Sequence, residues 1–384
     1  MKKLLITAIA FIIIGVTFMF GKTVSAKNIT VSPDVSDASA DGSYYSRDYI
    51  NIRNALNQIS NAGGGTLTLK SGTYKVSNTL YVGSNTNIKF EKNVTIDKLF
   101  GSASSSTLFQ LIDFGHKDSS NVYGGYNGKS NIHFYGDEST IIDMHNKNIG
   151  KTPAIAVVMA NNSDVSFYGI TFQNIKLGHI IEMDGCKNVK ISYCTFKNMA
   201  DNKYHNKEAI NLDTNDLNTG GFSQSWSKKD KTPNKNISIY DCQFENLVRA
   251  VGTHRYSLNK YHTKILFRNN KVTKVKTPLG MLNWKNATIR RNQFNNCKAN
   301  KKYNYSFFMA GVRNIKFYYN SFNNVKSKEV LKYYPKYQTS QKEYKPTKSK
   351  LSKKNIKLLK QNYARKGTKR KFKIGKKKYK WIKD

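Results

Sequence analysis

The chain has 384 residues, with 64 Lys and Arg against 24 Asp and Glu, and a formal net charge of +40 at pH 7. The basic excess is uneven, since residues 326–384 contain 23 basic and 3 acidic residues. Because the N-terminus indicates export (below), this charge favours an anionic polysaccharide or cell-wall polymer as partner and disfavours nucleic acid. The four cysteines form no C-x-x-C pair, which argues against a zinc site; they are Cys186, Cys194, Cys242 and Cys297.

Residues 1–26 have the layout of a signal peptide. Lys2 and Lys3 give a positive start, an apolar run follows over residues 4–20, and residues 24–26 read Val-Ser-Ala, as at an A-x-A cleavage site. We expect cleavage after Ala26, secretion, and no membrane contact of the mature chain. The alternative is an uncleaved anchor, because the run is close to the ~20 residues that span a bilayer.

The mature chain opens with the pattern of a capped stack of strands. Ile52, Ala55, Leu56 and Ile59 recur at helical spacing, which predicts an amphipathic helix near residues 49–61. Three consecutive glycines at 63–65 then predict a turn. The alternating segments that follow, 66–69, 79–82 and 87–90, predict short strands.

A repeat organises the rest of the chain. Each copy places apolar residues two apart, then a turn, then an aromatic or aliphatic residue, as in 163–172, 187–196, 235–244, 263–272, 285–294 and 313–322. The first apolar positions are spaced by 24, 48, 28, 22 and 28 residues, and we interpret the 48 as two turns; these positions are Val165, Val189, Ile237, Ile265, Ala287 and Ile315. A period in the twenties indicates one coil of a solenoid.

Residues beside these strands fit the same interpretation. Asparagine tolerates the left-handed backbone of tight corners, and it recurs at 174, 198, 246, 296 and 324. Cys194 and Cys242 occupy equivalent places in two copies, so we expect them to be small apolar fillers of a stacked core. A second strand follows in each coil, at 179–184, 208–213, 249–254 and 278–283. We expect Ile181, Met183, Ile210, Leu212 and Val251 to point into the core.

The helix, the Gly-Gly-Gly turn, the Ser71-Gly72-Thr73-Tyr74 segment and the stacked coils resemble the pectate-lyase-like superfamily. That group includes polygalacturonases, rhamnogalacturonases and phage tailspikes. Residues 131–136, Asn-Ile-His-Phe-Tyr-Gly, followed by Ile-Ile-Asp at 141–143, match it too. The resemblance covers roughly residues 45–325. It implies an all-β, right-handed, single-stranded parallel β-helix with a short N-terminal capping helix, in a secreted bacterial protein; both a monomer and a trimer stay open.

Polysaccharide-cleaving β-helices of this group carry their chemistry on outward side chains of one sheet. Here the outward positions of the second-strand sheet are unusually polar. The candidates for catalysis are Asp213, Asp184, Glu182, Glu208 and His254. Those for substrate binding are His179, Asn211, Arg255, Trp226 and Phe222; the last two belong to an insertion expected to wall this face, with rings that stack on sugars.

Two carboxylates with a histidine and an arginine are what glycoside hydrolysis needs, one acid protonating the leaving oxygen and the other activating water or attacking. Adjacent rungs place Asp184 and Asp213 roughly 5 Å apart at the backbone, while the Glu182–Asp213 diagonal is nearer ~8 Å. The first spacing suits retention and the second inversion. The sequence leaves both open. We therefore expect a glycoside hydrolase without a cofactor, acting on a cell-wall or extracellular polysaccharide.

Departures from the resemblance keep alternatives open. Residues 211–213, Asn-Leu-Asp, and 252–255, Gly-Thr-His-Arg, replace the Asn-Thr-Asp and Gly-His-Gly motifs of polygalacturonases. An adjacent Asp-Asp pair and an Arg-Ile-Lys motif are missing from the sequence, so pectin is not the expected substrate. One alternative is a polysaccharide lyase that binds calcium through Glu182, Asp184 and Asp213, with Arg255 as base. Another is a non-catalytic glycan- or wall-binding surface protein.

The coil pattern fades after Val325. We expect the coils to occupy residues 27–325, a linker to occupy 326–350, and a basic tail to occupy 351–384. In that tail, Lys alternates with Phe, Ile, Tyr and Trp, which predicts a small hairpin with its turn at Gly375. A solvated, disordered cationic tail is the alternative. The tail would hold the protein on an anionic wall polymer without a covalent bond, as in a Gram-positive bacterium.

Overall fold

The computed structural model describes residues 26–34, 44–218, 220–253, 260–300, 302, 304–337 and 347–384. The predicted signal peptide lies outside these residues except for Ala26. Within the described ranges, no helix combines the length and apolar character needed to cross a bilayer.

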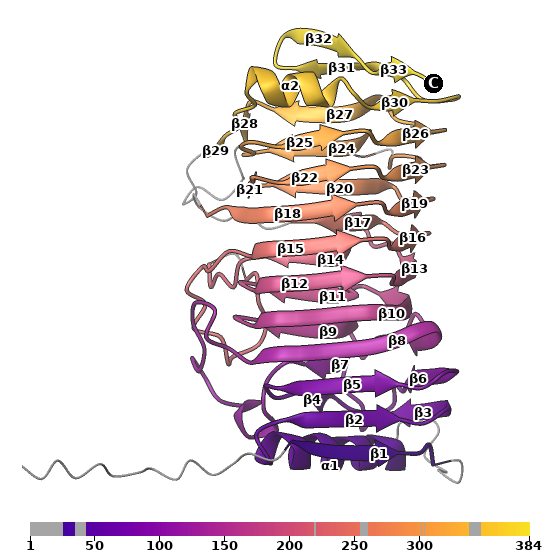
Figure 1. The fold of residues 1–384 in the computed structure, drawn as a ribbon, viewed down its shortest axis with the longest axis vertical. Helices are drawn as coiled ribbons and strands as arrows, with labels where there is room; N and C mark the ends of the chain where they lie inside the picture. Colours follow the sequence, from indigo (N-terminus) through magenta and orange to yellow (C-terminus); the bar gives the residue numbers. More distant parts are fainter. Residues whose placement is uncertain are drawn as a thin grey trace, which may run out of the picture.

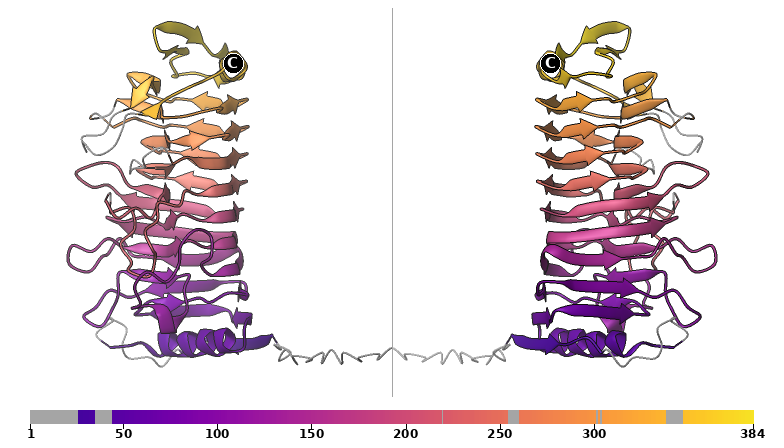
Figure 2. Two further views of the ribbon diagram at one scale, coloured as in Figure 1. Left: turned by 90° about the vertical axis from the view of Figure 1, so that its left-hand side faces the viewer. Right: turned by 90° about the vertical axis from the view of Figure 1, so that its right-hand side faces the viewer.

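The described chain winds into one continuous stack of coils built from parallel strands (Figure 1). Figure 2 shows that long loops leave the stack mainly on one side, in its middle and N-terminal parts. One face is a nine-stranded parallel sheet, referred to below as the site sheet. Its strands are β4 (Leu80–Tyr81), β7 (Thr107–Gln110), β9 (Ile155–Ala160), β11 (Ile181–Asp184), β14 (Glu208–Asp213), β17 (Arg249–Gly252), β20 (Thr277–Leu282), β24 (Tyr305–Ala310) and β27 (Glu329–Tyr334).

The other two faces form a continuous 20-stranded sheet that bends around the stack. The first face holds β1 (Lys27–Val31), β2 (Gly65–Leu69), β5 (Thr86–Phe90), β12 (Lys187–Ser192), β15 (Lys235–Tyr240), β18 (His262–Arg268), β21 (Trp284–Lys285), β22 (Thr288–Arg290) and β25 (Lys316–Tyr318). The second holds β3 (Gly72–Val76), β6 (Val94–Lys98), β13 (Thr195–Ala200), β16 (Gln243–Glu245), β19 (Lys271–Thr273), β23 (Gln293–Asn295), β26 (Ser321–Asn323), β30 (Tyr363–Ala364) and β33 (Ile382–Lys383). Two long strands, β8 (Ser130–Asp143) and β10 (Ser163–Lys176), run through both. A short 3₁₀ helix occupies Phe114–His116.

The repeat register predicts most of these pairings. Val165 pairs with Val189, as expected for neighbouring coils. Val189 also pairs directly with Ile237, so the interpretation of the 48-residue spacing as two turns is wrong. It is a single coil, because the residues between β13 and β15 form β14 and an insertion after it. This insertion comprises residues 214–234, of which 219 is not described.

The interior is apolar and close-packed, with one buried polar column. The predicted inward residues Ile181, Met183, Ile210, Leu212 and Val251 all belong to the main core cluster. The four cysteines are buried free thiols, which confirms the prediction that Cys194 and Cys242 are core fillers. Nearer the C-terminus the place of Cys194 and Cys242 is taken by asparagines whose amide groups bond one another from coil to coil, at 2.8–3.0 Å; this inner asparagine ladder comprises Asn270, Asn292, Asn320 and Asn362.

The predicted corners and N-terminal cap are confirmed. Asparagines 174, 198, 246, 296 and 324 all have positive φ, between 52° and 62°. Helix α1 (Arg47–Asn61) begins at Ser46, whose hydroxyl accepts from the Tyr49 amide, and its buried side covers the first coil. Glycine is required after the helix, since a Cβ on Gly65, at φ +153°, would lie 1.9 Å from the Lys27 carbonyl oxygen.

The expected linker and separate tail are corrected by the structure. β27 adds a further rung to the site sheet, and β28 (Lys336–Tyr337) pairs with β29 (Thr347–Lys348). Helix α2 (Lys353–Leu359) follows, β30 pairs with β26, and β33 pairs with β30, so stacked parallel strands continue to residue 383. The predicted hairpin is present as β31 (Lys371–Ile374) and β32 (Lys377–Lys380), with Gly375 at φ 60°. It closes the stack because Trp381 lies on Phe322, with ring centroids 4.3 Å apart.

Candidate functional site

Three of the four predicted catalytic acids lie together on β11 and β14. Asp184 stands opposite Asp213 and Glu182 stands opposite Asn211. Because neighbouring strand residues point to opposite faces, and the intervening residues face the core, these four side chains are on the outer face of the site sheet. The structure therefore brings Glu182, Asp184 and Asp213 together, and we call them the acidic cluster.

The acidic cluster is covered rather than open to solvent. Glu182 is 7% exposed, and Asp184 and Asp213 are both 0% exposed. Burial, followed by the charges of Glu182 and Asp213, raises the pKa of Asp184 well above its ordinary value. In the described part of the chain neither carboxyl oxygen of Asp184 has a hydrogen-bond partner. Asp213 instead accepts a hydrogen bond from the Asn211 amide at 3.2 Å, so the two aspartates differ in environment.

The backbone beneath the cluster is fixed by Asn234, which was not predicted as a site residue. Its side-chain amide donates to the carbonyl oxygens of Met183 (3.0 Å) and Asp213 (2.9 Å). It thereby ties the ends of β11 and β14 together. A sequence signal existed, because Asn162 and Asn234 each stand directly before an anchor strand, and Asn162 likewise donates to two carbonyl oxygens.

His262 lies behind the cluster and was left unassigned from the sequence. It is fully buried, and its Nδ1 accepts from the Asn234 backbone amide at 3.1 Å. Burial lowers the pKa of His262 to about 4, against a smaller opposing effect of Asp213. The imidazole is therefore neutral near pH 7 and adds no positive charge beside the acids.

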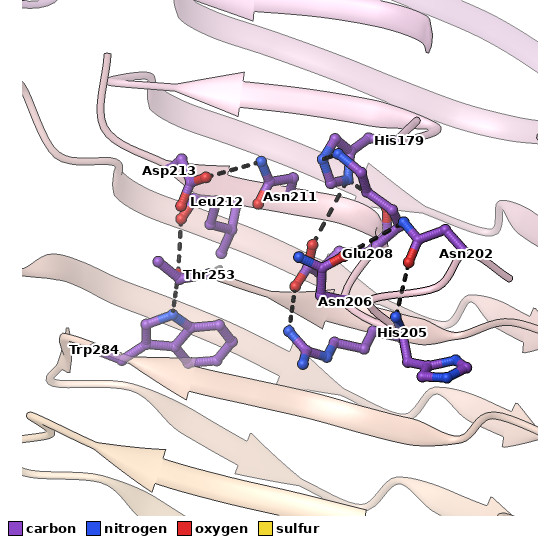
Figure 3. A network of polar contacts seen from close by, with 12 residues as sticks. His179, Asn202, His205, Asn206, Glu208, Asn211, Leu212, Asp213, Thr253 and Trp284 are labelled. Carbon is purple, nitrogen blue, oxygen red and sulfur yellow. Dashed lines mark hydrogen bonds and ion pairs between the residues drawn. The ribbon is translucent and has the colours of Figure 1, made fainter. Parts of the chain in front are cut away.

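Glu208 and His179 form a second group at the start of β14 (Figure 3). Arg249 binds the Glu208 carboxylate at 2.7 Å, and His179 Nδ1 lies 2.9 Å from the Glu208 carbonyl oxygen. All three side chains are buried. The guanidinium of Arg249 also lies over the Phe308 ring, 5.4 Å from its centroid. The Glu208 carboxylate is thus held in an ion pair with a cation. This distinguishes it from the acidic cluster, whose carboxyl groups lie beside one another.

The expectation that Trp226 and Phe222 present open rings to a sugar is wrong. They are 0% and 1% exposed and pack edge to face, with centroids 4.9 Å apart. Trp226 donates from its indole N–H to Gln110 at 3.1 Å. Their cluster includes Val158, an outward residue of β9. The insertion does wall the site sheet, as predicted, but it does so by burying its aromatic rings.

The two remaining candidates, His254 and Arg255, lie outside the described residues. They follow Thr253, whose hydroxyl donates to the Leu212 carbonyl oxygen (2.7 Å) and accepts from the Trp284 indole (3.0 Å). Figure 3 shows Thr253 between these two residues, beside Asp213. Among the described residues, no group of three His, Cys, Asp or Glu side chains is arranged to hold a metal ion.

The chain is similar in sequence to one known protein and in fold to several solved structures. No family model matches the chain. The chain is 25% identical over 255 residues to plasmin and fibronectin-binding protein A of Streptococcus pneumoniae. That alignment covers 60% of this chain and 35% of the relative, so it spans about a third of that protein's length.

Two solved structures share the architecture. The surface adhesin PfbA of Streptococcus pneumoniae superposes with a TM-score of 0.60 and 20% identity, over 78% of this chain and 80% of that one. A polygalacturonase from Erwinia carotovora gives 0.55 and 15% identity, over 81% of each chain. The chain thus has a right-handed parallel β-helix fold, similar to the folds of a surface adhesin and a polygalacturonase.

Proposed function

We propose that this protein is a polysaccharide hydrolase with Asp184 as general acid and Asp213 as its carboxylate partner. The observation that carries the proposal is the environment of Asp184. Its carboxyl is fully buried beside two other acids, and its pKa is raised well above the ordinary value. A raised pKa favours the protonated form of this carboxyl, which is the form that a general acid needs.

The partner role follows from the neighbouring rung. Asp213 accepts from Asn211, and a hydrogen bond to a carboxylate favours its charged form. In the proposed reaction the Asp184 O–H protonates the glycosidic oxygen as the C–O bond breaks. Asp213 attacks the anomeric carbon, and water later displaces it with Asp184 acting as base. Direct register places the two backbones about 4.8 Å apart, which suits the ~5–5.5 Å separation of retaining enzymes.

Glu182 is the alternative to Asp184 as the partner of Asp213. Glu182 lies two residues before Asp184 on β11. It stands opposite Asn211, which lies two residues before Asp213 on β14. Use of the wider Glu182–Asp213 pair would give inversion, with room for a water molecule. The configuration of the first-formed product therefore identifies the pair.

The decisive experiment is a polysaccharide panel incubated with the mature chain and with D184N and D213N. Release of reducing ends by the wild type alone supports the proposal, with each variant expected to lose about 10²–10⁴-fold in turnover. Full activity in both variants contradicts it. Unsaturated, ultraviolet-absorbing products that disappear with a chelator would instead establish the calcium-dependent lyase.

A second candidate is a non-catalytic glycan-binding protein at the cell surface. Two observations favour a non-catalytic role: the acidic cluster is covered, and the sequence is similar to a relative named for binding plasmin and fibronectin. Binding of a panel polymer without cleavage by the wild type would support this candidate over the hydrolase. For either candidate we propose secretion and non-covalent attachment to an anionic wall polymer, supported by the basic C-terminal residues.

A further inference from the structure

The C-terminal end of the stack carries a large open cleft. It has a volume of about 1220 Å³ and lies between β27 and the β31–β32 hairpin. A smaller hollow of about 340 Å³ shares Lys328 and Glu329 with it and extends toward Tyr305 and Tyr334. The two hollows are neighbours, and we call them together the cap cleft.

The charge of the cap cleft is strongly one-sided. Seven lysines and Arg370 line its larger part, against one carboxylate, Glu329. Glu329 is already paired with Lys332 at 3.0 Å. All seven lysines are exposed, and in the described part of the chain none has a carboxylate within ion-pair distance; they are Lys328, Lys360, Lys369, Lys371, Lys373, Lys378 and Lys380.

The hairpin concentrates four of these lysines at a cost to the fold. Lys371 stands directly opposite Lys380, and Lys373 stands opposite Lys378. Like charges in directly opposed cross-strand positions destabilise a hairpin. The alternate residues Phe372 and Tyr379 pack with rings 5.6 Å apart, and Phe372 reaches Trp381 at 5.4 Å. The aromatic residues thus stabilise the hairpin, while the opposed lysine pairs destabilise it.

The floor of the cleft is apolar. Val330, Leu331 and Phe372 line it and are buried. An apolar floor with a cationic rim suits a ligand whose backbone has carbon-bound faces and whose anionic groups repeat along it. Neutral glycans would leave the lysines unpaired, and a single small anion would engage only part of the rim.

We infer that the cap cleft binds a linear polyanion, a polymer with regularly spaced phosphate or sulfate groups. Phosphate-bearing wall polymers and sulfated glycans present this same chemistry. The inference rests on the proposed surface attachment, for which it supplies a defined site, and it is independent of hydrolysis at the acidic cluster. In this inference the protein attaches through a defined cleft in the folded structure, and not merely through the overall positive charge of its C-terminal residues.

The test uses the full mature chain, because Trp381 closes the stack and truncation would disturb the last coil. K371Q/K373Q/K378Q/K380Q removes four cleft charges. K89Q/K92Q/K190Q/K235Q removes four exposed charges from distant rungs and serves as the matched control. Binding to immobilised long-chain polyphosphate, to heparin and to neutral dextran is measured at two salt concentrations.

We expect the cleft variant to bind both polyanions at least about tenfold more weakly, with a shallower dependence on salt. The control should keep nearly wild-type affinity, and dextran should not bind at the cleft. Equal weakening in both variants, or equal binding of dextran, overturns the inference. The melting temperature of the cleft variant should stay constant or rise, whereas a drop would assign the lysines a structural role and count against it.

A measurement on cells separates this inference from the proposed attachment. If the cleft variant loses polyphosphate binding but the cell-bound fraction is unchanged, the cleft stands and the attachment proposal fails. If polyphosphate binding is unchanged, the cleft is overturned whatever the hydrolysis assay shows. Preference for polyphosphate over heparin would identify a phosphate-bearing polymer as the source, and the reverse a sulfated glycan.

Discussion

Asp184 and Asp213 stand directly opposite each other on β11 and β14, and both side chains are fully buried on the outer face of the site sheet. Two carboxyl groups in this position cannot both ionise at low cost, because each charge disfavours the other and burial disfavours both. The pairing of these two buried acids therefore has consequences for the pH dependence of stability and for catalysis.

The first prediction concerns pH and the D184N variant. The pKa of Asp184 is higher in the folded state than its value of about 3.9 in an unfolded chain. The folded state therefore binds more protons above that pH, and this contribution to stability decreases as pH rises. D184N removes it, so the variant should gain stability relative to wild type between pH 4 and pH 8. Thermal unfolding across this range measures the difference, and E245Q, on an exposed strand position, should show no such trend.

The second prediction separates Glu208 from the acidic cluster. Glu208 binds Arg249 at 2.7 Å in a buried ion pair. Removing one partner of a buried pair typically costs about 3–5 kcal/mol, so E208Q should lower the melting temperature strongly. D213N should change it little while abolishing turnover.

Replacement of both partners, as E208L/R249M, should recover much of the lost stability, since apolar residues can substitute for a buried pair. A stable, inactive E208Q would instead give Glu208 a direct part in catalysis. Chemical denaturation of the three variants distinguishes the two outcomes.

The third prediction concerns the buried Lys98. Its ammonium donates to the carbonyl oxygens of Ser77 (2.8 Å) and Leu99 (2.7 Å). Burial lowers the pKa of Lys98 to about 7, from 10.5. The unfolded chain therefore binds more protons between these values, and this contribution to stability rises as pH increases from 7 toward 10.

K98M removes the titration, so its advantage over wild type should be largest below pH 7 and shrink at higher pH. At pH 9–10 the variant should be the less stable protein, because the two carbonyl oxygens lose a donor, at about 1–3 kcal/mol. A constant difference over pH 6–10 would contradict the assignment. Unfolding free energies at five pH values suffice to test it.

The fourth prediction concerns the inner asparagine ladder. Asn292 donates to Asn320 at 2.8 Å and accepts from Asn270 at 3.0 Å, with both contacts buried. N292A leaves buried groups without partners on both sides, and we expect a loss of about 2–4 kcal/mol. The matched control is N296A, an exposed corner residue at φ 53°, which should cost only about 1–2 kcal/mol of backbone strain. Equal costs would mean that the ladder adds nothing.

The fold could be predicted because each coil repeats the same alternation of inward apolar residues and outward polar residues. An inward residue such as Val165 recurs at Val189, and strand alternation then assigns Glu182 outward once Ile181 is placed inward. The members of the acidic cluster follow from that alternation. Their burial does not, because strand alternation assigns a side chain to a face and says nothing about what packs over it.

Trp226 illustrates this limit. An aromatic residue in a polar loop has the same local pattern whether it is open or buried, and its partner Gln110 is 116 residues away. The C-terminal residues show it again. Alternating Lys and aromatic residues predict a hairpin, but only the contact of Trp381 with Phe322 makes that hairpin part of the stack.

The stacking of Trp381 on Phe322 also covers the C-terminal end of the stack of coils. A parallel coil without a cover presents unpaired N–H and C=O groups, which form a template for another chain. Proteolytic removal of the last residues would uncover that edge and, with it, the apolar ring of Phe322. The product to expect is then a growing filament of chains joined end to end, detectable by light scattering, rather than a shortened monomer with less charge.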